Sequence, residues 1–203
     1  MKPQHIFFLG ITATVVIIFF YALTDKKTEQ NYSENLLKAR EEREKEMKLS
    51  DQSPIENLEE FEGLSYYKPD PNFRLKATVE KTTSKQLYTI NRTDSSTVKF
   101  TAYAYLSFKW NNETYKLLAF NTAEDPNTLF IPFTDATNGQ GTYEGGRYLN
   151  LEKKEETEMV VDFNLAFNPS CVYNINYVCP IPPRENHLDF AVKAGEKLPI
   201  GEN

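Results

Sequence analysis

The chain has little cysteine and histidine and no surplus of basic charge, and each shortage excludes a class of protein. Two cysteines and two histidines are too few for a disulfide-rich scaffold or for a domain built around Cys/His metal sites. With 23 basic and 29 acidic residues the net charge is −6, which argues against binding of nucleic acid through charge. A Gly-rich phosphate loop and the HExxH and GxSxG patterns are also missing, so the sequence predicts neither a metal nor another cofactor.

What is present suits one folded domain of ordinary size with a short additional segment. The chain has 203 residues, 40% of them hydrophobic and 26% charged. This composition supports a packed core and excludes disorder of the whole chain. The composition changes along the sequence, which we divide into residues 1–24, 25–62 and 63–203.

Residues 1–24 are dominated by an apolar run. Ile6 to Leu23 contains no charged residue and as a helix would span roughly 27 Å, close to the ~30 Å core of a bilayer. This predicts a transmembrane helix that anchors a single-pass protein in the cell membrane, with a cleaved signal segment as the alternative. Because such N-terminal spans usually serve export, we expect the following domain on the extracytoplasmic side.

Residues 25–62 are strongly charged. Ser33 is a plausible N-cap for a helix through about Lys48, supported by pairs four residues apart such as Glu44–Lys48. Ser53-Pro54 predicts the start of a second, short helix that ends at Gly63. We interpret this part as a charged, solvated helical stalk, and a docking helix for a partner is the alternative.

Residues 63–203 alternate between apolar and polar side chains, the period of strands with one buried face. The predicted strands are 73–80, 98–109, 115–120, 129–133, 147–152, 158–167 and 188–193. Asn111-Asn112 is expected to turn the second strand into the third. Successive hairpins predict a mostly β domain, either an antiparallel sandwich or a small barrel.

Two details of this sheet bear on function. Strand 98–109 is predicted to bury Val98 to Phe108 on one face and to present Tyr103 and Tyr105 on the other, as a half-wet outer surface or as the lining of a cleft. Strands 147–152 and 158–167 are predicted to pair as a hairpin. That register sets Arg147 opposite Asp162, as a cross-strand ion pair.

The C-terminal third contains four ordered motifs. They read GGRYLNLE from Gly145, DFNLAFNPSCVYN from Asp162, CPIPPREN from Cys179 and AGEK from Ala194. In this order they closely resemble a bacterial family, domain of unknown function 1684, with the pattern GGRYLxLE, DFNxAxNPxCxYN, CPxPPxEN and AGEK. The resemblance covers about three quarters of the chain and implies no activity, because none is established for the family.

Candidate ligand-binding residues lie in these motifs: Arg147, Asp162, Asn164, Asn168, Tyr173, Asn174, Glu185 and Asn186. Arg147 and Asp162 form either a structural ion pair or a site in which Arg147 grips a carboxylate or phosphate. The asparagines and prolines predict a rigid loop, Asn164–Asn186, that crosses one end of the sheet. Loops of this kind often form ligand sites.

Cys171 and Cys179 stand eight residues apart in the same loop. In an oxidising compartment they predict a disulfide, which would stabilise the fold by about 2.5 kcal/mol. Two packed free thiols are the main alternative. A metal site lacks ligands, since only His187 is nearby, and no signature supports Cys171 as a nucleophile with His187 as its base.

The sequence therefore predicts an uncharacterised, membrane-anchored extracytoplasmic β domain that binds a small molecule or a protein of the cell envelope. The alternative is a small-molecule hydrolase or other enzyme with a site around Arg147, Asp162, Cys171 and Glu185. A cavity on which Arg147, Asp162 and Glu185 converge would favour the enzyme.

Overall fold

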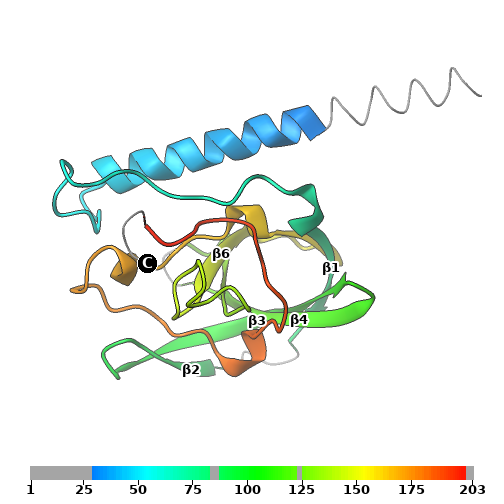
Figure 1. Cartoon of the computed structure of the whole chain (residues 1–203). Helices are drawn as coiled ribbons and strands as arrows, with labels where there is room; N and C mark the ends of the chain where they lie inside the picture. Colours follow the sequence, from blue (N-terminus) through cyan, green and yellow to red (C-terminus); the bar gives the residue numbers. More distant parts are fainter. Residues whose placement is uncertain (1–28, 83–86, 123–124, 200–203) are drawn as a thin grey trace, which may run out of the picture. The chain divides into compact units, whose positions relative to one another are not determined.

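The computed structural model describes residues 29–82, 87–122 and 125–199 (Figure 1). Residues 29–49 are helical, and the rest of the described chain consists of strands, turns and short 3-10 helices. Arg40–Asn203 form one compact unit, which we call the β domain and which includes the end of this helix. The unit before it, up to Ala39, contributes only helical residues to the described part.

A helix is confirmed here, as is its Glu44–Lys48 pair, whose carboxylate and ammonium are 2.6 Å apart. The predicted N-cap is wrong, because Ser33 lies inside the helical stretch 29–49. The predicted short helix after Ser53 is wrong, because this stretch contains only turns and bends. The Ser53 hydroxyl instead donates to the carbonyl of Met47 and accepts from the amide of Ile55. Ser53 therefore caps the end of the preceding helix and does not begin another.

Seven strands form a single antiparallel sheet. They are β1 (Arg74–Lys81), β2 (Leu87–Asn91), β3 (Thr97–Trp110), β4 (Glu113–Asn121), β5 (Thr128–Phe133), β6 (Arg147–Glu152) and β7 (Glu158–Asp162). The order is β6-β5-β4-β3-β1-β7, and β2 pairs with β3 beside this path. The turn between β3 and β4 has positive φ at both Asn111 and Asn112, as the sequence predicted.

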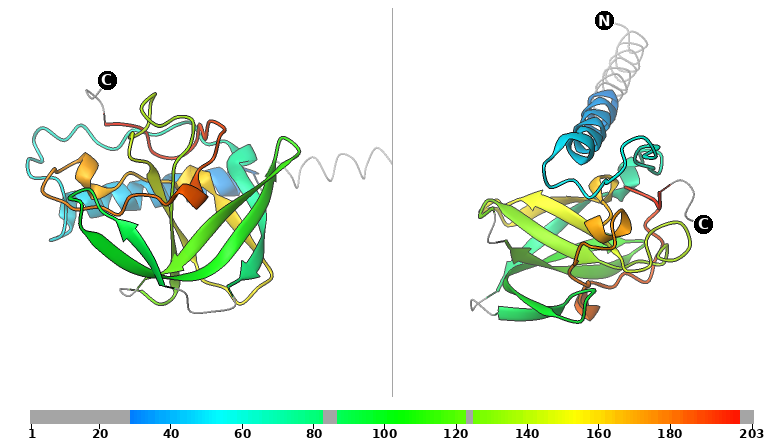
Figure 2. Two further views of the ribbon diagram at one scale, coloured as in Figure 1. Left: turned by 90° about the horizontal axis from the view of Figure 1, so that it is seen from below. Right: turned by 90° about the vertical axis from the view of Figure 1, so that its left-hand side faces the viewer.

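This sheet is neither a sandwich nor a closed barrel. It curls into a half-barrel (Figure 2), and its two end strands, β6 and β7, do not pair with each other. The predicted hairpin is wrong, because β6 pairs with β5 and β7 pairs with β1. Although β6 and β7 are joined by a short loop, that loop connects the two end strands of the sheet. The outer edge of β6 instead makes an isolated antiparallel bridge, between Tyr148 and Phe167 beyond the end of β7.

The predicted architecture is also corrected at its N-terminal side. We expected a transmembrane helix before the β domain, but no helix among the described residues is both long and apolar enough to cross a membrane. The predicted span itself, Ile6 to Leu23, lies outside the described residues. Neither the structure nor any comparison tests the predicted extracytoplasmic location, which stays a prediction.

A β-bulge divides the core into two clusters. The pairing of β3 with β4 slips between Ala102 and Ala104, and this reverses which side chains face which side of the sheet. Ala104, Leu106 and Phe108 pack in the main core, whereas Ala102 packs with Phe120 in a smaller cluster. The strict alternation predicted for this strand is therefore wrong.

The same bulge separates the two tyrosines that were predicted to share a polar face. Tyr103 is buried in the main core, and its hydroxyl donates to the carbonyl of Lys154. Tyr105 packs against the smaller cluster. The two side chains therefore do not form one binding surface.

The C-terminal residues 187–197, which we call the C-terminal strap, pack on the main core without forming a strand. Leu188, Val192 and Ala194 are fully buried there, so the alternation that predicted a strand over 188–193 reflects packing alone. Gly195 has φ +76°, and a Cβ at this position would lie 2.7 Å from two backbone carbonyl oxygens. Glycine is therefore required where the strap passes closest to the core.

Candidate functional site

Arg147 stands at the start of β6, and its guanidinium is completely buried. Nη1 donates to the carbonyl oxygens of Ala194, at 2.5 Å, and Glu196, at 3.1 Å. Nη2 donates to the carbonyl of Val192 at 2.8 Å and to the carboxylate of Asp135 at 2.8 Å. Arg147 therefore binds the backbone of the C-terminal strap.

Asp135 completes this arrangement from the loop after β5. Its Oδ1 accepts hydrogen bonds from the amide of Thr137 at 2.8 Å, the hydroxyl of Thr137 at 2.6 Å and the amide of Val192 at 3.1 Å. We call Arg147 and Asp135 the strap clamp. Each of its two charges meets an opposite charge and several backbone groups, as buried charges require.

The predicted partner of Arg147, Asp162, lies elsewhere. At the end of β7 it is opposite Arg74, with a 3.8 Å contact between Arg74 Nε and its Oδ2. Its other oxygen accepts from the amide and side chain of Asn164, both at 3.0 Å. Asn164 also exchanges two hydrogen bonds with the backbone of Asp70. These two residues fix the chain before β1 against the end of β7.

Asn186 is fully buried between β4 and β5, at a place where these two strands are no longer paired with each other. Its Nδ2 donates to the carbonyls of Leu118, at 2.9 Å, and Pro132, at 2.7 Å. Its Oδ1 accepts from the amide of Leu118 at 2.6 Å. The side chain thus pairs with β4 as a neighbouring peptide group would, at a place where Pro132 has no N–H to offer.

Replacing Asn186 with Ala is expected to lower the free energy of unfolding by about 2 kcal/mol, because three buried backbone groups lose their partner. Urea denaturation of the two proteins measures this difference. Asn150→Ala, at an exposed position of β6, is the matched control and should change the stability by less than about 0.5 kcal/mol. Equal effects of the two substitutions would contradict the pairing role.

Another buried titratable group is the carboxyl of Glu196, in the C-terminal strap. Its Oε1 accepts from Asn168 Nδ2 at 3.0 Å and from the hydroxyl of Tyr173, and Arg43 Nε lies 3.4 Å from its Oε2. Arg43 also stacks over the ring of Phe167, 4.2 Å from its centre. The end of the N-terminal helix is thereby attached to two of the four motifs.

The surroundings of Glu196 favour its neutral form. Burial raises its pKa from 4.5 to about 7, and this exceeds the opposing effects of Arg43 and Asn168. Two buried polar atoms nearby, the hydroxyl of Tyr66 and Oδ1 of Asn168, have no hydrogen-bond partner among the described residues. The polar groups around Glu196 therefore do not all have hydrogen-bond partners among the described residues.

The two cysteines lie side by side, and both are free thiols. Cys171 belongs to η3 (Ser170–Val172), and its amide donates to Cys179 Sγ at 3.2 Å. Cys179 is buried and is tied to Thr93 through both backbone groups. The structure therefore brings the predicted pair together, and the disulfide itself stays a prediction.

A groove of about 530 Å³ lies beside this loop. It is lined by residues 172–176 on the loop, by residues 55–57, 60 and 61 from the segment after the helix, and by Pro199. Glu56 joins the walls, since its carboxylate accepts from the side chains of Asn174 at 2.7 Å and Asn176 at 3.4 Å. Two of the predicted ligand-binding residues, Tyr173 and Asn174, line this groove.

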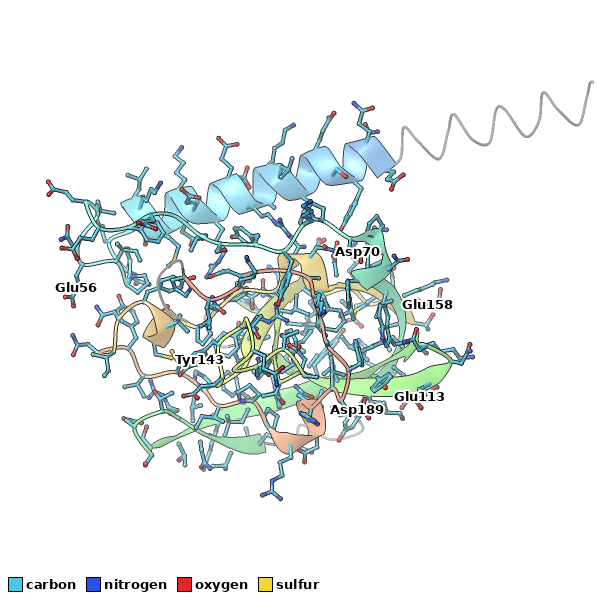
Figure 3. All side chains as sticks on the ribbon, viewed as in Figure 1. Glu56, Asp70, Glu113, Tyr143, Glu158 and Asp189 are labelled. Atoms are coloured by element: carbon cyan, nitrogen blue, oxygen red, sulfur yellow. The ribbon has the colours of Figure 1, made fainter. Side chains whose placement is uncertain are left out.

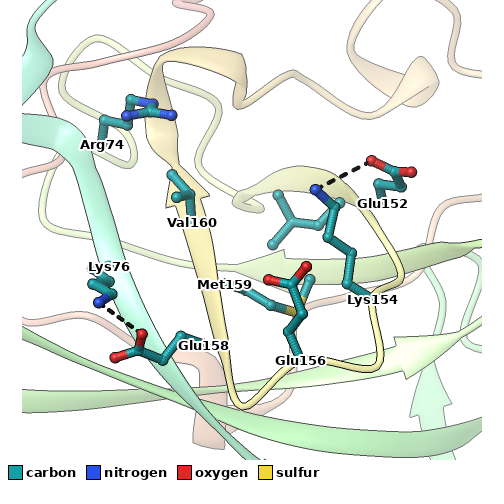
Figure 4. Close-up of a pocket in the computed structure, with 9 residues that line it drawn as sticks. Arg74, Lys76, Glu152, Lys154, Glu156, Glu158, Met159 and Val160 are labelled. Carbon is teal, nitrogen blue, oxygen red and sulfur yellow. Dashed lines mark ion pairs between the residues drawn. The ribbon is translucent and has the colours of Figure 1, made fainter.

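Another pocket, of about 370 Å³, opens between the end strands β6 and β7 (Figure 4). Its charged side chains neutralise one another: Lys76 lies 2.7 Å from Glu158, and Lys154 lies 3.6 Å from Glu152. These are exposed pairs of modest energy. The pocket is therefore a gap in the half-barrel, and none of the predicted site residues lines it.

The residues of the proposed enzyme site do not converge. Arg147 is occupied by the C-terminal strap, Asp162 lies at the end of β7, and Glu185 is exposed. Within the described part of the chain, no three His, Cys, Asp or Glu side chains are grouped so that they could hold a metal ion. The residues that do meet, at Glu196 and at the cysteines, come from three of the motifs.

Sequence reasoning missed several members of these clusters. Glu196 stands in the last of the four motifs and Asp135 lies before the first, and neither was chosen because no spacing rule links them to Arg147 or Asn168. Glu56 and Arg43 lie in the segment interpreted as a solvated stalk.

Figure 3 places Glu56 and Tyr143 toward one end of the domain and Glu113 and Asp189 toward the other.

Comparison with known proteins agrees with the motifs. A family model described as a protein of unknown function (DUF1684) matches residues 59–197, which include the whole sheet. The solution NMR structure of an uncharacterized protein from Haloarcula marismortui is 37% identical, has a TM-score of 0.70, and the match covers 87% of this chain and 99% of that one. No curated protein matches the chain.

Proposed function

The chain belongs to the DUF1684 family of proteins of unknown function, and from its groove we propose that it is a binding module for a short segment of a partner protein. The segment would carry an apolar side chain next to lysine or arginine. One observation carries this proposal: the groove combines apolar walls with carboxylates and ends at a fully presented isoleucine.

The apolar part of the groove is suited to a side-chain anchor. Ile55, Phe61 and Val172 line it, and Ile175 at the tip of the loop is 92% exposed. Ile175 alone would be ordinary, but it lines the same groove as these three apolar side chains, and grouped exposed apolar surface marks interaction sites. Leu58, which is 53% exposed, is a further apolar side chain of the segment that contains Ile55 and Phe61.

The charge of the groove selects the partner. Glu56 and Glu60 line it, and Glu59 and Glu62 stand in the same short segment. The chain as a whole is also negative. This potential attracts basic segments and repels acidic ones, so charge adds selectivity to the apolar contact.

The proposal is tested by fluorescence anisotropy of the reduced full chain with two labelled peptides, one of alternating lysine and leucine and one of alternating glutamate and leucine. We expect only the lysine peptide to bind, with an affinity that falls as salt rises. Ile175→Ser should weaken binding about tenfold, which corresponds to about 1.4 kcal/mol.

Leu87→Ser is the matched control, since Leu87 is 61% exposed on β2 and does not line the groove. It should leave the affinity unchanged. Equal binding of both peptides, or equal losses in the two variants, would contradict the proposed function.

A further inference from the structure

The two cysteines of the chain lie side by side at the two ends of one loop. We call residues 171–179 the cysteine loop. At one end Cys171 lies half-buried in η3, and at the other Cys179 is buried and leads into Pro180, which bridges to Arg92 near the end of β2. The guanidinium of Arg92 also donates to the carbonyl of Val178 at 2.9 Å. One end of the cysteine loop is thus fixed to the sheet. The other end belongs to η3 and is held by the backbone hydrogen bonds of that turn and by the contact of the Cys171 amide with Cys179 Sγ.

Both the backbone amide and the thiol of Cys171 contact the sulfur of Cys179. The amide of Cys171 donates to Cys179 Sγ at 3.2 Å, and the thiol of Cys171 hydrogen-bonds the same sulfur. The hydrogen bond from Cys171 lowers the pKa of Cys179 to about 7, and Arg92 acts in the same direction. The pKa of Cys171 is raised, first by its hydrogen bond to Cys179 and then by burial.

The more acidic thiol and the more accessible thiol are therefore different residues. Cys179 is 6% exposed, so it is the more acidic thiol but is shielded from solvent, whereas Cys171 is partly exposed. The Cys179 thiolate adjoins Cys171 and can accept its proton while the accessible Cys171 sulfur attacks an oxidant, so the buried sulfur acts as the base in this step. Cys179 then becomes the thiol that completes the reaction.

We propose that Cys171 and Cys179 form a thiol–disulfide exchange site that a low-molecular-weight disulfide oxidises. The Cys171 sulfur attacks one sulfur of the oxidant as its proton passes to the Cys179 thiolate, a mixed disulfide forms, and one thiolate leaves. Cys179 then loses its proton to solvent and attacks the Cys171 sulfur, which expels the second thiolate. The protein loses two electrons and forms one S–S bond, and the oxidant gains those electrons as two thiols.

A disulfide between Cys171 and Cys179 would restrict the loop residues that line the groove. The residues between the cysteines include Tyr173, Asn174 and Ile175, which line it, and the Tyr173 hydroxyl reaches the buried Glu196. A disulfide would restrict this wall and so regulate the binding of a partner segment. This regulatory consequence rests on the proposed function, whereas the exchange reaction does not.

The test incubates the native full chain with mixtures of oxidised and reduced glutathione, without peptide, and follows intact mass and free thiols. We expect loss of both thiols with no retained glutathione, reversal by a dithiol reductant, and a rise in Tm of about 5–10 °C. Cys179→Ser should stop at a glutathione adduct on Cys171. Cys171→Ser should react about tenfold more slowly, because its remaining thiol is buried.

The exchange site would be overturned if the native chain kept both thiols in mixtures that oxidise the urea-unfolded chain. Stable accumulation of the adduct on the unsubstituted protein would overturn it as well, because ring closure would then have failed. The peptide-binding test uses reduced protein, so the two proposals fail separately.

Discussion

Replacing Arg147 with Met is expected to lower the free energy of unfolding by about 3–5 kcal/mol, the largest effect of any substitution considered for this chain. Methionine is similar in length but leaves the Asp135 carboxylate buried without its counter-charge. Four acceptors also lose their donors: Asp135 and the carbonyls of Val192, Ala194 and Glu196. Since domains of this size are stable by about 5–15 kcal/mol, much of the stability would be lost.

Urea denaturation of Arg147→Met and of the double variant Arg147→Met with Asp135→Asn measures the clamp. The double variant should be destabilised by less than the sum of the single changes, because the neutral amide removes the unpaired charge. Arg184→Met, at an exposed arginine, is the control and should remain within about 0.5 kcal/mol of the unsubstituted protein. A similarly small effect at Arg147 would contradict a structural clamp.

Replacing Glu196 with Gln is expected to change the dependence of stability on pH. With its pKa raised from 4.5 to about 7, Glu196 binds a proton more tightly in the folded than in the unfolded chain. Its contribution is therefore fully present below pH 4.5 and is lost as pH rises through about 7. Between pH 5 and pH 8 the stability of the variant should increase relative to the unsubstituted protein by about 3 kcal/mol.

The physical cause is the burial of a carboxylate that has only one basic neighbour. Arg43 lies 3.4 Å away but is itself partly exposed, so its charge is screened and does not offset the desolvation of Glu196. The other groups at the site, Asn168, Tyr173 and Tyr66, are neutral. A carboxyl proton is therefore favoured up to about neutral pH.

Chemical denaturation at a series of pH values gives the two profiles. Glu185→Gln, which changes an exposed glutamate, is the control and should leave the profile parallel to that of the unsubstituted protein. Parallel profiles for Glu196→Gln would show that Glu196 is charged at all these pH values and would contradict its described environment.

Most strands could be predicted from the sequence because alternation is a local property. The strands at 73–80, 98–109, 115–120, 129–133 and 147–152 all exist within a residue or two. Their pairing is not local, and this is where the prediction failed. The short loop between β6 and β7 suggested a hairpin, but the curl of the sheet places these strands at opposite edges. The bulge after Ala102 likewise could not be predicted, because the apolar and polar residues of the β3 sequence alternate without interruption there.

The sequence indicated the region of the candidate site but not the contacts that its residues make, and their predicted ligand-binding role stays a prediction. Asn168, Tyr173 and Asn174 do lie at the groove or at Glu196, and Cys171 does meet Cys179. Arg147 was predicted as one half of an ion pair but was given the wrong partner: its carboxylate is Asp135, and its other contacts are backbone carbonyls of the C-terminal strap. A backbone carbonyl carries no signal in a sequence.

The separation of a structural clamp from a recognition groove is tested most directly by one measurement: the affinity of the lysine–leucine peptide for Arg147→Lys and for Ile175→Ser. We predict that Arg147→Lys lowers Tm but binds the peptide as tightly as the unsubstituted protein. Ile175→Ser should keep the Tm and bind about tenfold more weakly. Loss of affinity in folded Arg147→Lys, with binding retained in Ile175→Ser, would contradict this account.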